Sequence, residues 1–205
     1  MLKFLKYLLS LLLFILVLVF LYHQYSLNKE KKLLTSSIGQ RVEVDGKKMN
    51  VYVAGNGPKT LVFLSGSGTS SPILDFKSLY SKLVKDYRVV VVEKFGYGFS
   101  DDWSKDRDLD TILSQTRKAL QKADVKGPYV LLPHSMSGLE AMHWSASYPK
   151  EVEAIIGLDM SLSQAYDKYR SNRLLYKTLQ LAANLGLSRW LYSPDKEIHS
   201  LSNGS

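Results

Sequence analysis

The chain has 205 residues, of which 45% are hydrophobic and 22% charged, and this composition indicates a folded protein and excludes a disordered one. It contains no cysteine, which excludes disulfides, thiolate metal sites and cysteine nucleophiles. Half of the net charge of +8 lies in residues 1–35, which hold five lysines and one glutamate, and the rest shows no basic stripe, so we expect no nucleic-acid partner.

The first element in chain order is the uncharged apolar run 7–22, with lysines on both sides. Its length and flanks predict a transmembrane anchor over residues 1–25, with lipid as its partner. A buried core helix stays open as an alternative, whereas a cleaved signal peptide is disfavoured because residues 22–26 offer no A-x-A-like cleavage pattern. We expect a single-pass membrane protein whose catalytic part is extracytoplasmic.

Residues 26–37 read as a polar linker, and residues 38–162 as the folded core. Hydrophobic residues alternate with polar ones on both sides of Asp45-Gly46, which predicts a β-hairpin. Short unbroken apolar runs then follow at 60–64, 87–92, 129–132 and 154–158. Runs of this kind are typical of strands that are covered on both faces, as in a parallel sheet.

Helical patterns separate these runs. One begins at Ser71-Pro72, which supplies a cap and a first-turn proline; another follows Asp108 or Asp110 as its cap; a third ends at Tyr148-Pro149. The order of hairpin, strand, helix, strand, helix, strand, helix and strand predicts an α/β fold with a mostly parallel sheet.

The third of the apolar runs leads directly to Ser135, and small residues then open a helix. This layout is typical of a nucleophile elbow, a tight turn that lifts a serine hydroxyl above the end of a sheet. Ser135 is therefore a candidate covalent nucleophile. The alternative is a serine that only caps the following helix.

Three motifs at strand ends resemble those of the α/β-hydrolase superfamily, in its lipase, esterase and proline-iminopeptidase-like group. Residues 133–138 (P-H-S-M-S-G) are similar to G-H-S-M-G-G, residues 95–101 (F-G-Y-G-F-S-D) to P-G-Y-G-x-S-D, and residues 64–68 (L-S-G-S-G) to L-H-G-x-G. The resemblance extends from Ile38 to Ser161. The sequence departs from the pattern at Pro133 and Ser137, which replace the two elbow glycines, and at Ser65, which replaces a histidine.

The resemblance implies a role for individual residues. Ser135 would attack an acyl carbonyl, and the backbone N–H groups of Ser67 and Met136 would form the oxyanion hole. Asp159 follows the nucleophile by 24 residues, the spacing of the triad acid in a dehalogenase-like minority of the family. The alternative for Asp159 is a helix cap.

The histidine that should act as the base is not found in this chain. His134 adjoins the nucleophile and points away from it, His143 lies two helical turns further, and His23 and His199 lie near the two ends of the sequence. The family's last two strands, with their usual acid and histidine, are also missing. The chain is therefore interpreted as C-terminally truncated, and residues 163–205 as the start of a helical lid and a tail.

Two functions are compatible with these features. The first is a membrane-anchored serine hydrolase that cleaves ester, amide or peptide bonds of small substrates through an acyl-enzyme on Ser135, impaired by the truncation. The second is a non-catalytic hydrolase remnant that binds lipid or a protein partner at the membrane. A nucleotide-binding domain is disfavoured, because neither glycine pair completes G-x-G-x-x-G. We expect no metal and no organic cofactor.

Overall fold

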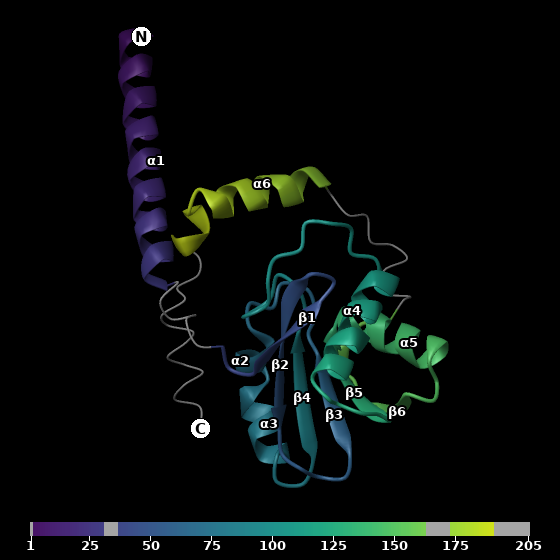
Figure 1. The fold of residues 1–205 in the computed structure, drawn as a ribbon. Coiled ribbons are helices and arrows are strands. Elements are labelled where there is room, and N and C mark those ends of the chain that lie inside the picture. Colours follow the sequence, from purple (N-terminus) through teal and green to yellow (C-terminus); the bar gives the residue numbers. More distant parts are fainter. Residues whose placement is uncertain (1, 31–36, 163–172, 191–205) are drawn as a thin grey trace. The chain divides into compact units, whose positions relative to one another are not determined.

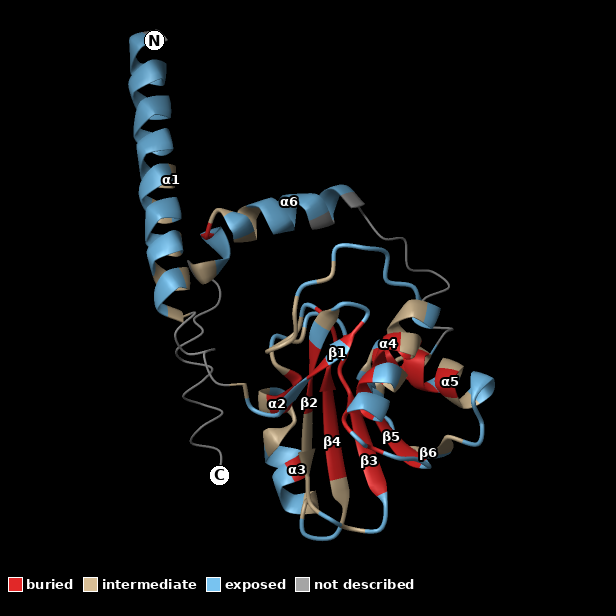
Figure 2. Ribbon diagram, viewed as in Figure 1, coloured by how far each residue is buried: buried red, intermediate tan, exposed pale blue. Residues whose placement is uncertain are grey.

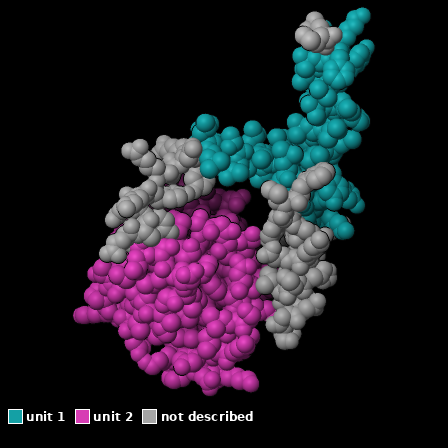
Figure 3. Space-filling view, turned by 180° about the vertical axis from the view of Figure 1, so that it is seen from behind, with its two compact units in different colours: residues 1–36, 170–202 teal, residues 37–169, 203–205 magenta. Residues whose placement is uncertain are grey.

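The computed structural model describes residues 2–30, 37–162 and 173–190. The chain divides into two compact units, which Figure 3 shows in different colours. One comprises residues 1–36 and 170–202, and the other comprises residues 37–169 and 203–205.

Within residues 37–162 the larger unit forms a seven-stranded sheet (Figure 1). Its strands are β1 (Gln40–Val44), β2 (Lys47–Ala54), β3 (Thr60–Leu64), β4 (Arg88–Glu93), β5 (Tyr129–Ser135), β6 (Val152–Ile155) and β7 (Leu158–Met160). The order is β1-β2-β4-β3-β5-β6, and β7 also pairs with β5. Strands β1 and β2 are antiparallel to their neighbours, whereas β3, β4, β5, β6 and β7 pair in parallel. The predicted α/β fold is confirmed.

The hairpin that begins the sheet turns at Asp45-Gly46, as predicted. The two residues have φ angles of +52° and +79°. Two successive positive φ angles are the signature of the tight turn whose twist matches that of the flanking strands. The adjacent register pairs Val44 with Lys47 and Val42 with Met49, which places the valines on the buried face.

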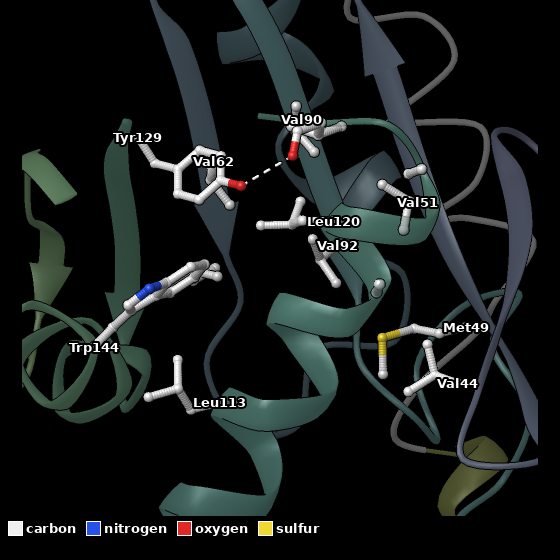
Figure 4. Packing of buried hydrophobic residues seen from close by; sticks show 14 of the residues in the cluster. Val44, Met49, Val51, Val62, Val90, Val92, Leu113, Leu120, Tyr129 and Trp144 are labelled. Atoms are coloured by element: carbon white, nitrogen blue, oxygen red, sulfur yellow. Dashed lines mark hydrogen bonds between the residues drawn. The ribbon is translucent and has the colours of Figure 1, made fainter. Parts of the chain in front are cut away.

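Helices cover both faces of the sheet (Figures 1 and 2). On one face α4 (Leu109–Lys122) and α5 (Ser137–Ser147) pack against alternate residues of the central strands, and Figure 4 shows residues of that cluster, including Trp144. The hydroxyl of Tyr129 donates to the carbonyl of Val125 within it, at 2.9 Å. On the other face the short helices α2 (Pro72–Asp75) and α3 (Lys77–Leu83) cover the remaining residues of these strands. Coverage on both faces explains why β3 and β4 are apolar without alternation.

The predicted strand at 154–158 is wrong as a single element. The chain forms β6 up to Ile155, leaves the ladder, and pairs with β5 again as β7 from Leu158. Gly157 lies in the break, and a Cβ built there would lie 2.8 Å from the Cγ of Met160. The side chain of Met160 thus occupies the space beside a residue without one, and the break brings β7 alongside the end of β5.

One of the two predicted helix caps is confirmed. The carboxylate of Asp108 accepts from the backbone N–H of Thr111 at 2.7 Å and caps α4, so the choice between Asp108 and Asp110 falls on the first. Ser71 precedes α2 as expected, but its side chain caps nothing there. Its hydroxyl donates instead to a carboxylate oxygen of Glu93 at 3.0 Å.

The smaller unit contains α1 (Leu2–Glu30), α6 (Arg173–Asn184) and the 3-10 helix Leu187–Trp190. With 29 residues, α1 extends about 43 Å at 1.5 Å per residue, and it is apolar enough to cross a membrane. Arg189 forms an ion pair with Glu30 at 2.7 Å near the end of α1. Of the predicted lid and tail, 163–172 and 191–205 lie outside the described residues.

Candidate active site

Ser135 is the last residue of β5 and has a φ angle of +51°. A residue with a side chain rarely adopts this left-handed conformation, because its Cβ then crowds the backbone. Helix α5 begins two residues later, after Met136 as its N-cap. The strand therefore turns into the helix through one strained residue, which is the geometry of the predicted elbow.

The loop after β3 packs directly against this turn. A Cβ built on Gly66 would lie 2.8 Å from the Cβ of Ser135, 3.4 Å from its Oγ and 3.0 Å from the carbonyl oxygen of His134. Real Cβ atoms do not approach other carbons so closely, so only glycine allows the two segments to meet here. The close approach brings the backbone of residues 65–68, the predicted oxyanion loop, next to the Ser135 hydroxyl.

Ser137 has a structural role that the sequence analysis missed. Its hydroxyl accepts from the backbone N–H of His134 at 2.9 Å and lies 2.6 Å from the carbonyl oxygen of Leu64, to which it donates. One buried hydroxyl thus bridges β5 and β3 where their ladder ends, next to the register pair of Leu64 and Pro133. A glycine, which the family pattern has at position 137, would leave these two backbone groups without this bridge.

Gly138 permits a second close approach. A Cβ at this position would lie 2.3 Å from the carbonyl oxygen of Ser161. The backbone N–H of Ser161 in turn donates to the carbonyl of Ser135 at 2.9 Å. The start of α5 and the end of β7 are therefore held close together around the elbow.

A cavity of about 480 Å³ lies between the oxyanion loop, the start of α5 and the start of α4. Ser67 and Met136, whose N–H groups are the predicted oxyanion donors, both line it. Its walls combine the apolar side chains of Leu109, Ile112, Met136 and Leu139 with polar and charged residues. Asp108 also lines the cavity, and the backbone N–H of Thr111 lowers the pKa of its carboxyl group. The two predicted donor segments therefore face one cavity large enough for a small substrate.

Asp159, the predicted triad acid, is the central residue of β7. This strand pairs with the end of β5, with Met160 opposite Ser135. Asp159 is exposed and has a φ angle of +51°. Among the described residues, none donates a hydrogen bond to its side chain. Asp159 thus lies beside the strand of the nucleophile, and its role as the triad acid stays a prediction. The helix that it was alternatively expected to cap lies outside the described residues.

No histidine ring within the described residues forms a hydrogen bond with the Ser135 hydroxyl. The exposed ring of His134 packs edge-on against Phe76, with centroids 6.3 Å apart. On α5, the Nε2 atom of His143 lies 2.7 Å from a carboxylate oxygen of Asp110. His23 lies in the other unit, where its Nδ1 accepts from Arg189 at 2.8 Å. His199 falls outside the described residues, and the base remains unassigned.

A buried carboxylate shapes the loop after β4, and the sequence analysis missed it as well. Glu93 is fully buried, and its Oε2 accepts from the N–H of Phe99 at 2.8 Å and from the side chain of Asn50 at 3.0 Å. Gly98 lies so close that a Cβ there would be 2.1 Å from Glu93 Oε1. This arrangement folds residues 94–101 back over the strand end and brings Tyr97 to the wall of the cavity.

Lys94 and Glu140, which also line the cavity, form a buried ion pair. The sequence analysis assigned neither a role, because a loop lysine and a helix glutamate usually face solvent. One signal was available for Glu140. It lies four residues before Trp144, on the buried side of α5, and residues 137–147 contain no other aspartate, glutamate, lysine or arginine.

Comparison with known proteins agrees with this geometry. Residues 59–187 match the family model described as the alpha/beta hydrolase fold, over more than half of the chain. The uncharacterized protein YbdG of Bacillus subtilis (strain 168) is 47% identical over 193 residues, which cover 91% of this chain and 59% of YbdG. A 2-(acetamidomethylene)succinate hydrolase of Mesorhizobium japonicum is 24% identical over 60% of this chain and 43% of its own length. The chain thus spans less than two thirds of these relatives.

A solved structure of a meta-cleavage product hydrolase from Pseudomonas fluorescens IP01 shares the fold, with a TM-score of 0.53 and 20% identity. The match covers 58% of this chain and 43% of that structure. At this identity the likeness concerns the fold alone. Together with the family model and the elbow around Ser135, it leads to one conclusion: the chain belongs to the α/β-hydrolase family.

Proposed function

We propose that the chain is the nucleophile-bearing part of a membrane-anchored serine hydrolase. Ser135 would attack the carbonyl carbon of an ester, amide or peptide bond in a small substrate. The carbonyl oxygen would become an oxyanion that the N–H groups of Ser67 and Met136 stabilise, and the leaving group would depart with a proton to give an acyl-enzyme. The observation that carries the proposal is the φ angle of +51° at Ser135, directly against the glycine of the neighbouring loop.

The strain at Ser135 supports a catalytic role over a capping role. A serine that caps a helix has extended backbone angles and accepts a bond from an N–H of the first turn. Ser135 has neither, because its backbone is left-handed and the N-cap position belongs to Met136. Strain of this kind persists where the surrounding structure fixes it, and it is concentrated at active sites.

The remaining parts of the mechanism come from other segments. Asp159 is proposed as the acid that orients and stabilises the protonated base, because β7 places it beside the strand of the nucleophile. The base itself is assigned to no described residue. Helix α1 is proposed as the anchor, since its length and composition suit a bilayer.

Labelling with a fluorophosphonate probe tests the proposal. This reagent phosphonylates an activated serine, with loss of fluoride and of the hydroxyl proton. We expect the full chain in detergent to label, Ser135→Ala to reduce labelling to background, and Ser147→Ala, on the exposed end of α5, to label like the wild type. Equal labelling of wild type and Ser135→Ala would contradict the proposal and favour the remnant that binds lipid or a protein partner.

The pH dependence of labelling tests for a histidine base. If a histidine activates Ser135, the labelling rate should rise with pH around the ordinary histidine pKa of about 6.5, because only the neutral ring accepts a proton. A rate that rises only with hydroxide, well above pH 8, would mean that no such base acts in this chain.

A further inference from the structure

The ion pair at the wall of the cavity is unusually deep for two charged side chains. The ammonium nitrogen of Lys94, the first residue after β4, contacts the Oε2 atom of Glu140. The two side chains are 9% and 2% exposed. A buried ion pair often recovers only part of the free energy lost in desolvating its charges, and apolar residues of the same size would stabilise the fold as well. Folding stability therefore does not explain why this ion pair is buried at the wall of the cavity.

Lys94 also holds the oxyanion loop. Its Nζ atom donates to the carbonyl oxygen of Ser65 at 3.0 Å, at the point where the loop leaves β3. Because the peptide unit is planar, this bond fixes the plane between Ser65 and Gly66. Only the φ and ψ angles of Gly66 then separate that plane from the one that carries the N–H of Ser67. Holding this carbonyl thus restricts the direction of the Ser67 N–H.

Glu140 fixes the other end of the pair. It lies one helical turn after Met136, whose N–H is the second proposed donor, so it moves with the start of α5. Its Oε1 atom accepts from the hydroxyl of Thr116 on α4 at 3.0 Å. Thr116 is fully buried, and the carboxylate is therefore held from two sides. Lys94 thus connects the oxyanion loop to a carboxylate on the nucleophile helix that Thr116 also holds.

We propose that the ion pair of Lys94 and Glu140 sets the position of the oxyanion loop relative to α5, so that the N–H groups of Ser67 and Met136 converge on one oxygen atom. Lys94 and Glu140 are positioning residues, because they act through the backbone donors. The consequence for the reaction rate rests on the proposed function. Two donors stabilise an oxyanion only when both lie about 3 Å from it, and a displacement of about 1 Å at a catalytic site can cost on the order of 100-fold in rate.

The test replaces both charges at once, with Lys94→Met and Glu140→Leu in the full chain in detergent. A single replacement would leave a buried unpaired charge and is expected to threaten folding, whereas the double replacement keeps an apolar pair of similar size. We expect near-native unfolding behaviour in urea. The rate of Ser135 phosphonylation should fall about tenfold or more, and hydrogen exchange at 64–69 and 134–140 should rise in both segments together.

The matched control removes an ion pair elsewhere in the same unit. Arg117→Met breaks the contact of Arg117 with Glu151, which joins α4 to the chain before β6. This variant should lose stability and keep both the labelling rate and the exchange of the two donor segments. If Lys94 and Glu140 had only a structural role, the double variant would also keep the labelling rate and the exchange of the two donor segments.

The outcomes separate the two proposals. Unchanged exchange in both donor segments of the double variant overturns the positioning role, whatever the labelling shows. Coupled exchange with an unchanged labelling rate overturns it too, since the loop would then have moved without consequence. A wild type that does not label overturns the proposed function, and exchange alone then decides whether the ion pair holds the loop.

Discussion

The bodies of β3 and β4 and the residues at their carboxyl ends are equally buried but differ in chemistry. Residues 61–64 of β3 and 89–92 of β4 are all apolar and at most 5% exposed. The residues that follow, Ser65, Glu93 and Lys94, are at most 7% exposed and polar. Burying apolar groups stabilises the fold, whereas burying polar groups costs free energy unless hydrogen bonds compensate. The polar residues at the strand ends therefore contribute less to folding stability than apolar residues would, and their hydrogen bonds fix the positions of the loops at the candidate site.

The largest effect on folding should come from the body of the sheet. Phe63 is fully buried between the sheet and α2 and α3, with its ring 5.2 Å from that of Phe76. Phe63→Ala should lower the free energy of unfolding by about 3–5 kcal/mol, through lost burial and the cavity that remains. Urea denaturation measures this, and the folded fraction should label at the wild-type rate. A lower labelling rate in that fraction would mean that packing in the body of the sheet also controls the reactivity of Ser135.

At the carboxyl edge of the sheet, a substitution of Gly66 should affect labelling more than stability. In Gly66→Ala the new methyl group would lie 2.8 Å from the Cβ of Ser135 and must displace the oxyanion loop. We expect labelling to fall on the order of 100-fold, as for a misplacement of about 1 Å. Gly68→Asn is the control, because a Cβ there meets nothing within 4 Å and asparagine tolerates the φ angle of +80°. Equal rates in the two variants would contradict the close packing of loop and elbow.

Ser137 lies at the edge and yet should affect mainly stability. Ser137→Ala removes the hydroxyl that bridges His134 and Leu64, and it leaves the partly buried N–H of His134 and the buried carbonyl of Leu64 without that partner. The expected loss is about 1–3 kcal/mol in the free energy of unfolding, the cost of such unsatisfied groups. Ser147→Ala should change it by less than about 0.5 kcal/mol. A loss as small at Ser137 would show that the bridge contributes nothing to the elbow.

The smallest effect is expected at the amino end of the sheet. Glu151 accepts two bonds from Arg117 and one from the indole of Trp144, and the Arg117 guanidinium lowers the pKa of its carboxyl group. This contribution is fully present above the unfolded pKa of about 4.5 and is lost as pH falls through the lower folded value.

Glu151→Gln should therefore cost about 1 kcal/mol at pH 7, discounted because the pair is partly exposed. The difference from the wild type should shrink below about pH 4.5. Unfolding in urea at several pH values measures it, and labelling at pH 7 should not change. A difference that grows on acidification would contradict the assignment of the stabilised state to the ionised carboxylate.

Much of this contrast could be predicted from the sequence. Unbroken apolar runs identified the buried strands, and the Asp45-Gly46 turn and a cap at Asp108 or Asp110 followed from local chemistry that depends on few neighbours. The elbow at Ser135 could also be placed, because a strand that ends in small residues before a helix has few alternatives. These features are encoded within short stretches of chain.

The polar contacts of the edge could not be predicted in the same way. Ser137, Glu140 and Lys94 act through partners on other elements, and nothing in their local sequence indicates those partners. The break between β6 and β7 likewise depends on how Met160 packs beside Gly157. A charged residue on the apolar side of a helix, as at Glu140, is a signal that would have identified the buried carboxylate, although not its partner Lys94.

A crystal structure of the phosphonylated full chain would test the central claim most directly. We expect a phosphorus atom bonded to the Oγ of Ser135, with one phosphonyl oxygen about 2.7–3.1 Å from the backbone nitrogens of both Ser67 and Met136. A phosphonyl group on another residue, or one on Ser135 with its oxygens turned away from both amides, would contradict it.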